Sequence, residues 1–298
     1  MDGLEPLIVG VDGSGAAATA LDWALERTAG EMPLHVVHGR KPPGDLAFDL
    51  FHSGDDMSEH EAREALEGPW TEAARKRDRR IATHLVADDP ADALLAVAAE
   101  VGARAVVVGV HGSGGKRYGL GSVTRKLLHR SSLPLVIAKP AQFRAVPGQR
   151  KPVVAYVGYG DATEDAARWA SEFAAAVDLP LLLVHVVGYR PMFPADSPSD
   201  TLASYLGGDV SRDWAQADLN RLKEELVERS PGLSVDTKVE VGFAVRAIEE
   251  GSRSAELVVL GKRHGSSLAR HTISPRIQQS IVRSATTTVV VPTCSTSQ

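Results

Sequence analysis

The segment LIVGV at residues 7–11 recurs as VVAYV at residues 153–157, and this repetition decides the fold of the chain. The tryptophan that follows each segment, Trp23 or Trp169, is repeated at the same offset. Three further apolar segments recur in the same order: 34–38 as 181–185, 105–109 as 257–261, and 133–137 as 287–291. A repeat of this length indicates a duplicated domain, because solenoids are built from much shorter units.

The chain has 298 residues, a length typical of two domains that each bury a core. We predict one domain at residues 1–142 and a second at residues 151–298. The segment from Lys139 to Pro152 lies between the two copies, is rich in proline and basic residues, and lacks any apolar period, as expected of a linker.

Within each copy, short apolar runs alternate with segments of helical period. This pattern predicts an α/β fold: two tandem doubly wound domains, each a five-stranded parallel sheet of order 3-2-1-4-5 with helices on both faces. In the first copy, strands are expected near residues 7–11, 33–38, 81–86, 105–109 and 133–138. Ser58 and Glu61 form a capping-box pattern, and Pro90 suits a first helical turn. Residues 41–57 and 189–212 fit neither pattern and are expected to be loops.

Composition excludes several functional classes. The chain has 43% apolar and 24% charged residues and a formal net charge of -5, so it lacks the basic surface of a nucleic-acid-binding protein. Its apolar runs are too short for a membrane helix, and we expect a cytoplasmic protein without membrane or nucleic-acid partners. Because Cys294 is the single cysteine, an internal disulfide and a four-cysteine zinc site are both excluded.

A glycine-rich loop after the predicted fourth strand carries the main functional signal. Six glycines fall between Gly109 and Gly121, and Ser122, Val123 and Thr124 then open a helix. Glycines allow backbone N–H groups to converge on phosphate, and a helix N-terminus adds N–H groups and positive dipole charge. The P-loop and dinucleotide patterns do not fit this spacing. Phosphate binding and a merely flexible turn are both compatible with the loop taken alone.

Asp12 follows the first strand directly and favours the binding hypothesis. In the predicted strand order, strands 1 and 4 are neighbours at the topological switch point, so Asp12 and the glycine loop should face one crevice. A carboxylate there can accept a hydrogen bond from an exocyclic amine or a ribose hydroxyl. The alternative is that Asp12 merely caps the first helix.

These motifs together resemble the universal stress protein family in its tandem form. The resemblance implies that ATP is the ligand, with Mg²⁺ at most a counter-ion of its phosphates. It also implies that Asp12 and Gly39 face the adenine and that the loop faces ribose and phosphates. The residues that match the family's binding positions are Asp12, Gly39, Gly109, Gly112, Gly121, Ser122 and Val123. Thr124 joins the candidate binding residues on separate grounds, because its hydroxyl, like that of Ser122, can contribute to phosphate binding.

The two copies depart from the family pattern in opposite ways. In the first copy, eight residues separate Gly112 from Gly121, one fewer than the family spacing. In the second copy the spacing is kept, but His264 and Pro275 replace loop residues and Gly158 replaces the aspartate. We therefore expect nucleotide to bind in the first domain only.

Our leading hypothesis is a stress-response regulatory protein that binds ATP in its first domain. The alternative is a non-nucleotide dimerisation or interaction module with the same fold. We predict neither a catalytic residue nor a protein-bound metal, and at most slow nucleotide hydrolysis. The resemblance further implies that the closing strands support a homodimer or an intrachain pseudo-dimer.

Overall fold

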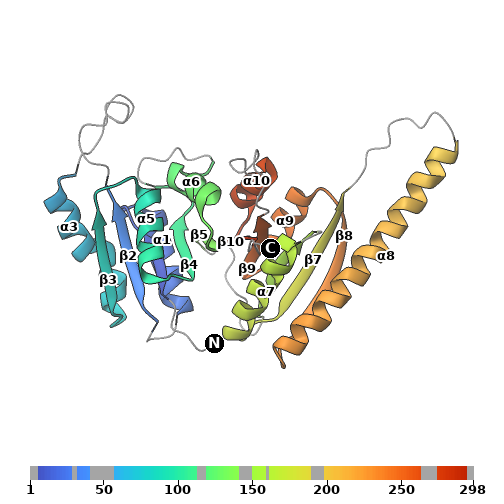
Figure 1. Cartoon of the computed structure of the whole chain (residues 1–298), viewed down its shortest axis with the longest axis horizontal. Helices are drawn as coiled ribbons and strands as arrows, with labels where there is room; N and C mark the ends of the chain where they lie inside the picture. The colour runs from blue at the N-terminus through green and yellow to red at the C-terminus, as the bar shows by residue number, and fades with distance from the viewer. Residues whose placement is uncertain are drawn as a thin grey trace. The chain divides into compact units, whose positions relative to one another are not determined.

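The computed structural model describes residues 6–28, 32–40, 57–112, 119–140, 150–158, 161–188, 198–262 and 274–293, with the backbone alone for 161–163 and 198–211. The chain divides into two compact units, Met1–Pro140 and Ala141–Gln298 (Figure 1). Each unit holds five strands joined by helices. Within the described residues, no helix is both long and apolar enough to cross a membrane.

The first unit contains a parallel sheet of order β3-β2-β1-β4-β5, which confirms the predicted order. Its strands are β1 (Leu7–Gly10), β2 (Leu34–Gly39), β3 (Ile81–Val86), β4 (Ala105–Gly109) and β5 (Leu135–Ala138). Every residue of β4 is buried, as expected of a central strand covered on both faces. The expected strand positions are therefore confirmed to within about two residues at their ends.

Helices cover both faces of this sheet. They are α1 (Gly15–Arg27), α3 (Glu59–Glu67), the short 3₁₀ helix η1 (Pro69–Thr71), α4 (Glu72–Lys76), α5 (Pro90–Val101) and α6 (Ser122–Arg130). The neighbouring residues His38 and Gly39 of β2 contact η1 and α5, respectively, so these two helices lie on opposite faces. The capping box of Ser58 and Glu61 is present at the start of α3, as predicted.

One carboxylate joins α5 to α6. Asp89 is the N-cap of α5, where its Oδ1 accepts the N–H of Ala91 at 3.1 Å. The Oδ2 of the same side chain pairs with Nζ of Lys126 on α6 at 2.5 Å. A second ion pair, between Asp92 and Arg130, lies further along the same two helices.

The second unit repeats the arrangement, with a parallel sheet of order β8-β7-β6-β9-β10. Its elements are β6 (Val153–Val157), α7 (Asp161–Ala176), β7 (Leu181–Gly188), α8 (Pro198–Arg229), β8 (Val235–Gly242), α9 (Ala244–Ser252), β9 (Leu257–Lys262), α10 (Pro275–Arg283) and β10 (Thr288–Pro292). In chain order, these five strands reproduce the 3-2-1-4-5 pattern of the first unit.

The loop expected at residues 189–212 is partly wrong, because α8 begins at Pro198. Proline is tolerated in a first helical turn, and each of Gly207 and Gly208 weakens a helix by only about 1 kcal/mol. The later part of α8 buries Ala215, Leu219, Leu222 and Leu226, and this packing stabilises the helix as a whole. Residues 189–197, like residues 41–56 of the other expected loop, lie outside the described residues.

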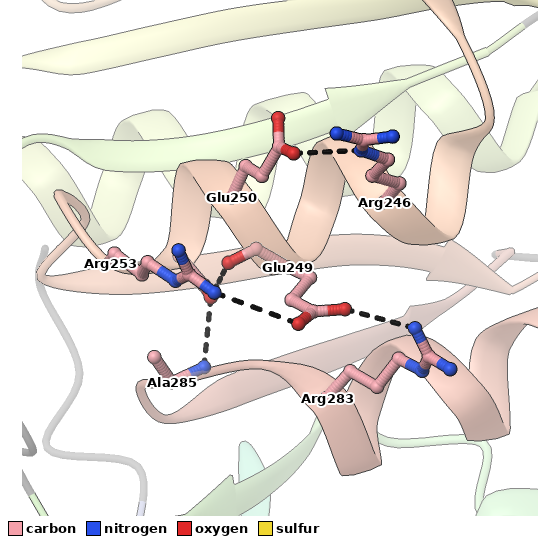
Figure 2. A network of polar contacts seen from close by, with 7 residues as sticks. Arg246, Glu249, Glu250, Arg253, Arg283 and Ala285 are labelled. Carbon is pink, nitrogen blue, oxygen red and sulfur yellow. Dashed lines mark hydrogen bonds and ion pairs between the residues drawn. The ribbon is translucent and has the colours of Figure 1, made fainter.

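Polar contacts of α9 connect it to α10 (Figure 2). Glu249 pairs with Arg253 on its own helix at 3.7 Å and with Arg283 of α10 at 3.1 Å. Beneath these exposed pairs, the hydroxyl of Ser252 accepts the backbone N–H of Ala285 at 2.8 Å. Ser252 is only 1% exposed, so this hydrogen bond is shielded from water whereas the ion pairs are not.

Candidate functional site

The candidate site lies at the carboxyl edge of three neighbouring strands in the first unit. Gly39 ends β2, Gly109 ends β4, and Asp12 lies two residues beyond the end of β1. Because β1 is paired in parallel with both β2 and β4, these strand ends meet at one edge of the sheet. This is the position at which doubly wound folds bind ligands.

The structure places Asp12 against the glycine loop. A Cβ added to Gly112 would lie 2.5 Å from Oδ2 of Asp12, so only glycine permits this close approach. The Oδ1 of Asp12 accepts the N–H of Ser14 at 3.0 Å. The N-cap of α1 is Ser14, whose hydroxyl accepts the N–H of Ala17, and the alternative role of Asp12 as that cap is therefore wrong.

The two ends of the glycine loop meet although only eight residues separate them. The N–H of Gly121 donates to the carbonyl oxygen of Val110 at 2.9 Å. A Cβ on Gly121 would lie 3.3 Å from Cα of His111 and 3.5 Å from the backbone nitrogen of Gly112. The shortened spacing thus still brings Gly112 and Gly121 together. Residues 113–118, including Lys116 and Arg117, lie outside the described residues.

Helix α6 begins directly at this junction, and its first backbone donors lack partners among the described residues. Its N-cap is Gly121, which provides no side-chain acceptor. Within the part of the chain that the structure describes, the N–H groups of Ser122, Val123 and Thr124 have no hydrogen-bond partner, and the first bonded N–H is that of Arg125. Three free N–H groups at the positive end of a helix dipole form an anion-binding surface.

Two of the predicted site residues have a structural role that their sequence positions do not reveal. Thr124 is 2% exposed, and its hydroxyl donates to the carbonyl oxygen of Gly109 at 3.0 Å. The expectation that this hydroxyl serves the ligand is therefore not supported, which leaves only the backbone N–H of Thr124. A Cβ on Gly109 would lie 2.6 Å from the backbone of Ala16, so helix packing alone requires glycine there.

Gly39 and His111 complete the described part of the site. A Cβ on Gly39 would lie 2.5 Å from Cα of Pro90, so the end of β2 and the start of α5 are in close contact. His111 lies in the glycine loop, where its Nδ1 is buried without a hydrogen-bond partner among the described residues. A buried imidazole nitrogen of this kind is available to a ligand group that enters the loop.

The equivalent helix start in the second unit, that of α10, offers no free N–H group in its first three positions. Pro275 is the first residue of α10 and has no N–H. The hydroxyl of Ser274 accepts the N–H of Arg276 at 3.3 Å, and the carbonyl oxygen of Ser274 accepts that of Ile277 at 3.0 Å. Gly158 follows β6 in the place of Asp12 and supplies no carboxylate. His264 lies outside the described residues.

The first-unit site offers groups that suit a phosphate-containing ligand. The free N–H groups of α6 suit phosphate oxygens, the bare backbone of Gly112 allows close approach, and Asp12 supplies a carboxylate beside them. In the described residues there is no group of three or more His, Cys, Asp or Glu side chains placed to hold a metal ion.

Comparison with known proteins identifies the family. The model of the universal stress protein family matches the chain twice, at residues 3–139 and 149–292. The chain belongs to the universal stress protein family. The two matches correspond to the two copies that the repeat predicts, so this member carries the family domain in tandem.

Individual relatives agree with this membership. A universal stress protein of Mycolicibacterium smegmatis is 25% identical over 297 residues, covering 96% of both chains. A universal stress protein of Mycobacterium tuberculosis is 34% identical over 142 residues, covering 45% of each chain. The crystal structure of a universal stress protein from Archaeoglobus fulgidus covers 99% of this chain and 98% of its own, with a TM-score of 0.67 at 18% identity, which shows the same fold.

Sequence reasoning missed one aromatic residue at this edge of the sheet. Trp70 of η1 lies on Gly13, where an added Cβ would be 2.6 Å from the indole Nε1. Trp70 also contacts His38, with ring centroids 4.9 Å apart. No local pattern signals this contact, because η1 is distant from both partners in the sequence.

Proposed function

We propose that this universal stress protein binds ATP in its first unit and uses the bound nucleotide as a regulatory signal. The observation that carries the proposal is the start of α6, where three N–H groups without a partner among the described residues lie next to Gly112 and Asp12. Phosphate oxygens would accept from Ser122, Val123 and Thr124. Asp12 and the backbone of Gly39 would face ribose and base, with Mg²⁺ as counter-ion of the phosphates.

Binding is expected in the first unit alone. The N–H groups at the start of α10 are either absent or already bonded, so a phosphate there would have to displace internal hydrogen bonds. The second unit would then serve as a structural partner. A cytoplasmic location and pairing through the closing strands stay predictions.

The sharpest test introduces into α6 the proline that begins α10. Ser122→Pro places in α6 the residue that α10 already has at its first position, Pro275. The backbone of Gly121, at φ -58 and ψ 157, suits a residue that precedes proline, so folding should be preserved. The variant removes one N–H donor to a charged group and should raise the Kd for ATP about tenfold or more in calorimetric titration.

Pro275→Ser is the matched control and should leave the titration unchanged, with one ATP bound per chain. An unchanged Kd in Ser122→Pro would refute the assignment of α6 to the phosphates. If the wild-type protein shows neither heat of binding nor an ATP-dependent thermal shift, the alternative of a non-nucleotide interaction module is favoured. Turnover is tested separately by phosphate release, and we expect none beyond a slow background.

A further inference from the structure

Trp70 occupies a defined position beside the candidate site. Its indole lies directly on the backbone of Gly13, the residue after Asp12, since a Cβ there would be 2.6 Å from Nε1 and 2.8 Å from Cε2. Gly13 has φ +77, a conformation that favours glycine, and no side chain separates the β1–α1 turn from the indole. The side chain of Trp70 is half-buried, so part of the ring is open to a ligand.

The turn that carries Trp70 is held by side-chain hydrogen bonds on both sides. The hydroxyl of Thr71, which is 2% exposed, donates to the carbonyl oxygen of Leu66 at 2.9 Å. Arg75 donates from Nη1 to the carbonyl oxygen of Glu67 at 2.8 Å and from Nη2 to that of Gly68 at 2.5 Å. These bonds fix η1 between α3 and α4, and the indole is therefore pre-positioned rather than free.

His38 lies against the same indole and has a defined tautomer. Its Nδ1 is 2.8 Å from the carbonyl oxygen of Val11, which can only accept, so Nδ1 carries the hydrogen. In the neutral ring Nε2 is then a hydrogen-bond acceptor. Within the described residues Val11 is the one hydrogen-bond partner of the His38 side chain, whose ring meets that of Trp70 edge-on at 64°.

We propose that Trp70 and His38 together recognise the base of the bound nucleotide. This inference rests on the proposed ATP binding and adds two side chains to a base end so far made of Asp12 and Gly39. The face of Trp70 packs against the purine ring, and Nε2 of His38 accepts from the exocyclic amine of adenine. Guanine carries a carbonyl oxygen at that position, so two hydrogen-bond acceptors, this oxygen and Nε2 of His38, would face each other. The pair therefore selects adenine over guanine nucleotides.

The experiment measures ATP and GTP binding by calorimetry and follows tryptophan fluorescence in the same titrations. The wild-type protein should bind ATP at least about tenfold more tightly than GTP. Trp70→Ala should weaken ATP binding about tenfold, the usual scale of lost base stacking. His38→Leu, which keeps an apolar contact with Trp70 but has no acceptor, should bring the two affinities within about threefold of each other.

Fluorescence provides a second, independent readout. The chain has four tryptophans, and ATP should change the emission of the wild-type protein through Trp70. Trp70→Phe should abolish most of that response. Trp214, which is 70% exposed in the second unit, is the matched control, and Trp214→Phe should keep the response intact. This readout tests the proposal even if His38→Leu proves unstable.

The outcomes separate the two proposals. If the wild-type protein binds no nucleotide, the proposed function fails and this inference fails with it. If ATP binds while Trp70→Phe keeps the full fluorescence change and His38→Leu keeps the preference for ATP, the inference alone is overturned. A loss of ATP preference in His38→Leu together with a lost signal in Trp70→Phe supports it.

Discussion

The start of α6 in the first unit and the start of α10 in the second unit occupy the same place in the same fold. Their first backbone N–H groups nevertheless differ in whether they are hydrogen-bonded within the described residues. In α6 three N–H groups lack partners among the described residues, whereas in α10 a proline and the cap Ser274 leave none free in the first three positions. The two sheets have the same strand order. The two units therefore differ at the first turn of one helix and not in the strand order around it.

The largest expected effect tests which glycines serve packing rather than binding. Gly109→Ala places a Cβ 2.6 Å from the backbone of Ala16, so β4 and α1 must separate. We expect the free energy of unfolding to fall by about 2–3 kcal/mol, measured by thermal denaturation without nucleotide. Gly15→Ala, where no atom lies within 4 Å of the added Cβ, is the control and should be close to neutral. Equal stability of both variants would contradict the packing role.

A smaller loss is expected when the buried contact between α9 and α10 is removed. Ser252→Ala leaves the N–H of Ala285 without its acceptor in the second-unit core, which should cost about 1–2 kcal/mol of unfolding free energy. Ser254→Ala removes an exposed hydroxyl on the same turn and should change stability by less than about 0.5 kcal/mol. The measurement is denaturant unfolding. A loss no greater than that of the control would show that Ser252 contributes nothing.

Substitution of the two N-cap residues should affect different properties. Ser274→Ala removes the acceptor for Arg276 and should destabilise the second unit by about 1 kcal/mol without changing the Kd for ATP. Gly121→Ala puts a Cβ 3.3 Å from Val110 and His111, which should spread the loop junction and raise the Kd severalfold. Thermal denaturation and calorimetry on both variants distinguish these effects. An ATP response to Ser274→Ala would place nucleotide in the second unit.

The smallest expected effect is a loss of folding stability at acid pH, to which one histidine in each unit contributes. Burial, and then the charge of His84, lower the pKa of His35, against an opposing contribution from Glu100. Burial also lowers the pKa of His185, opposed by Asp218. Since the unfolded chain binds these protons more readily, stability should be constant above about pH 6.5 and decrease as the pH falls below that value.

Thermal denaturation between pH 7.5 and 5 measures this trend. His35→Gln should flatten the decrease by removing one titrating group from the first unit, while the contribution of His185 remains. A melting temperature that rises on acidification would have the wrong sign and would contradict the burial of neutral histidines.

The sequence predicted the parts of the fold that depend on local pattern. The unbroken apolar run at residues 105–109 indicated a central strand, and Ser58, Glu61 and Pro90 correctly marked two helix starts. Proline and glycine misled at residues 198–212, because the packing of a later part of α8 outweighs their local cost.

Only those site residues that directly follow neighbouring strands could be placed together from the sequence. Asp12 and Gly112 follow neighbouring strands, so their proximity could be inferred from the strand order. That the hydroxyl of Thr124 reaches Gly109, or that Trp70 lies on Gly13, depends on tertiary contacts between distant segments. Such contacts leave no signal in a local pattern.

Asp89 connects three elements near the candidate site through one side chain. One of its oxygens accepts from the first turn of α5, the other pairs with Lys126 of α6, and Pro90 beside it packs closely against Gly39 at the end of β2. Loss of this single carboxylate would therefore remove the N-cap of α5 and its ion pair with α6 together.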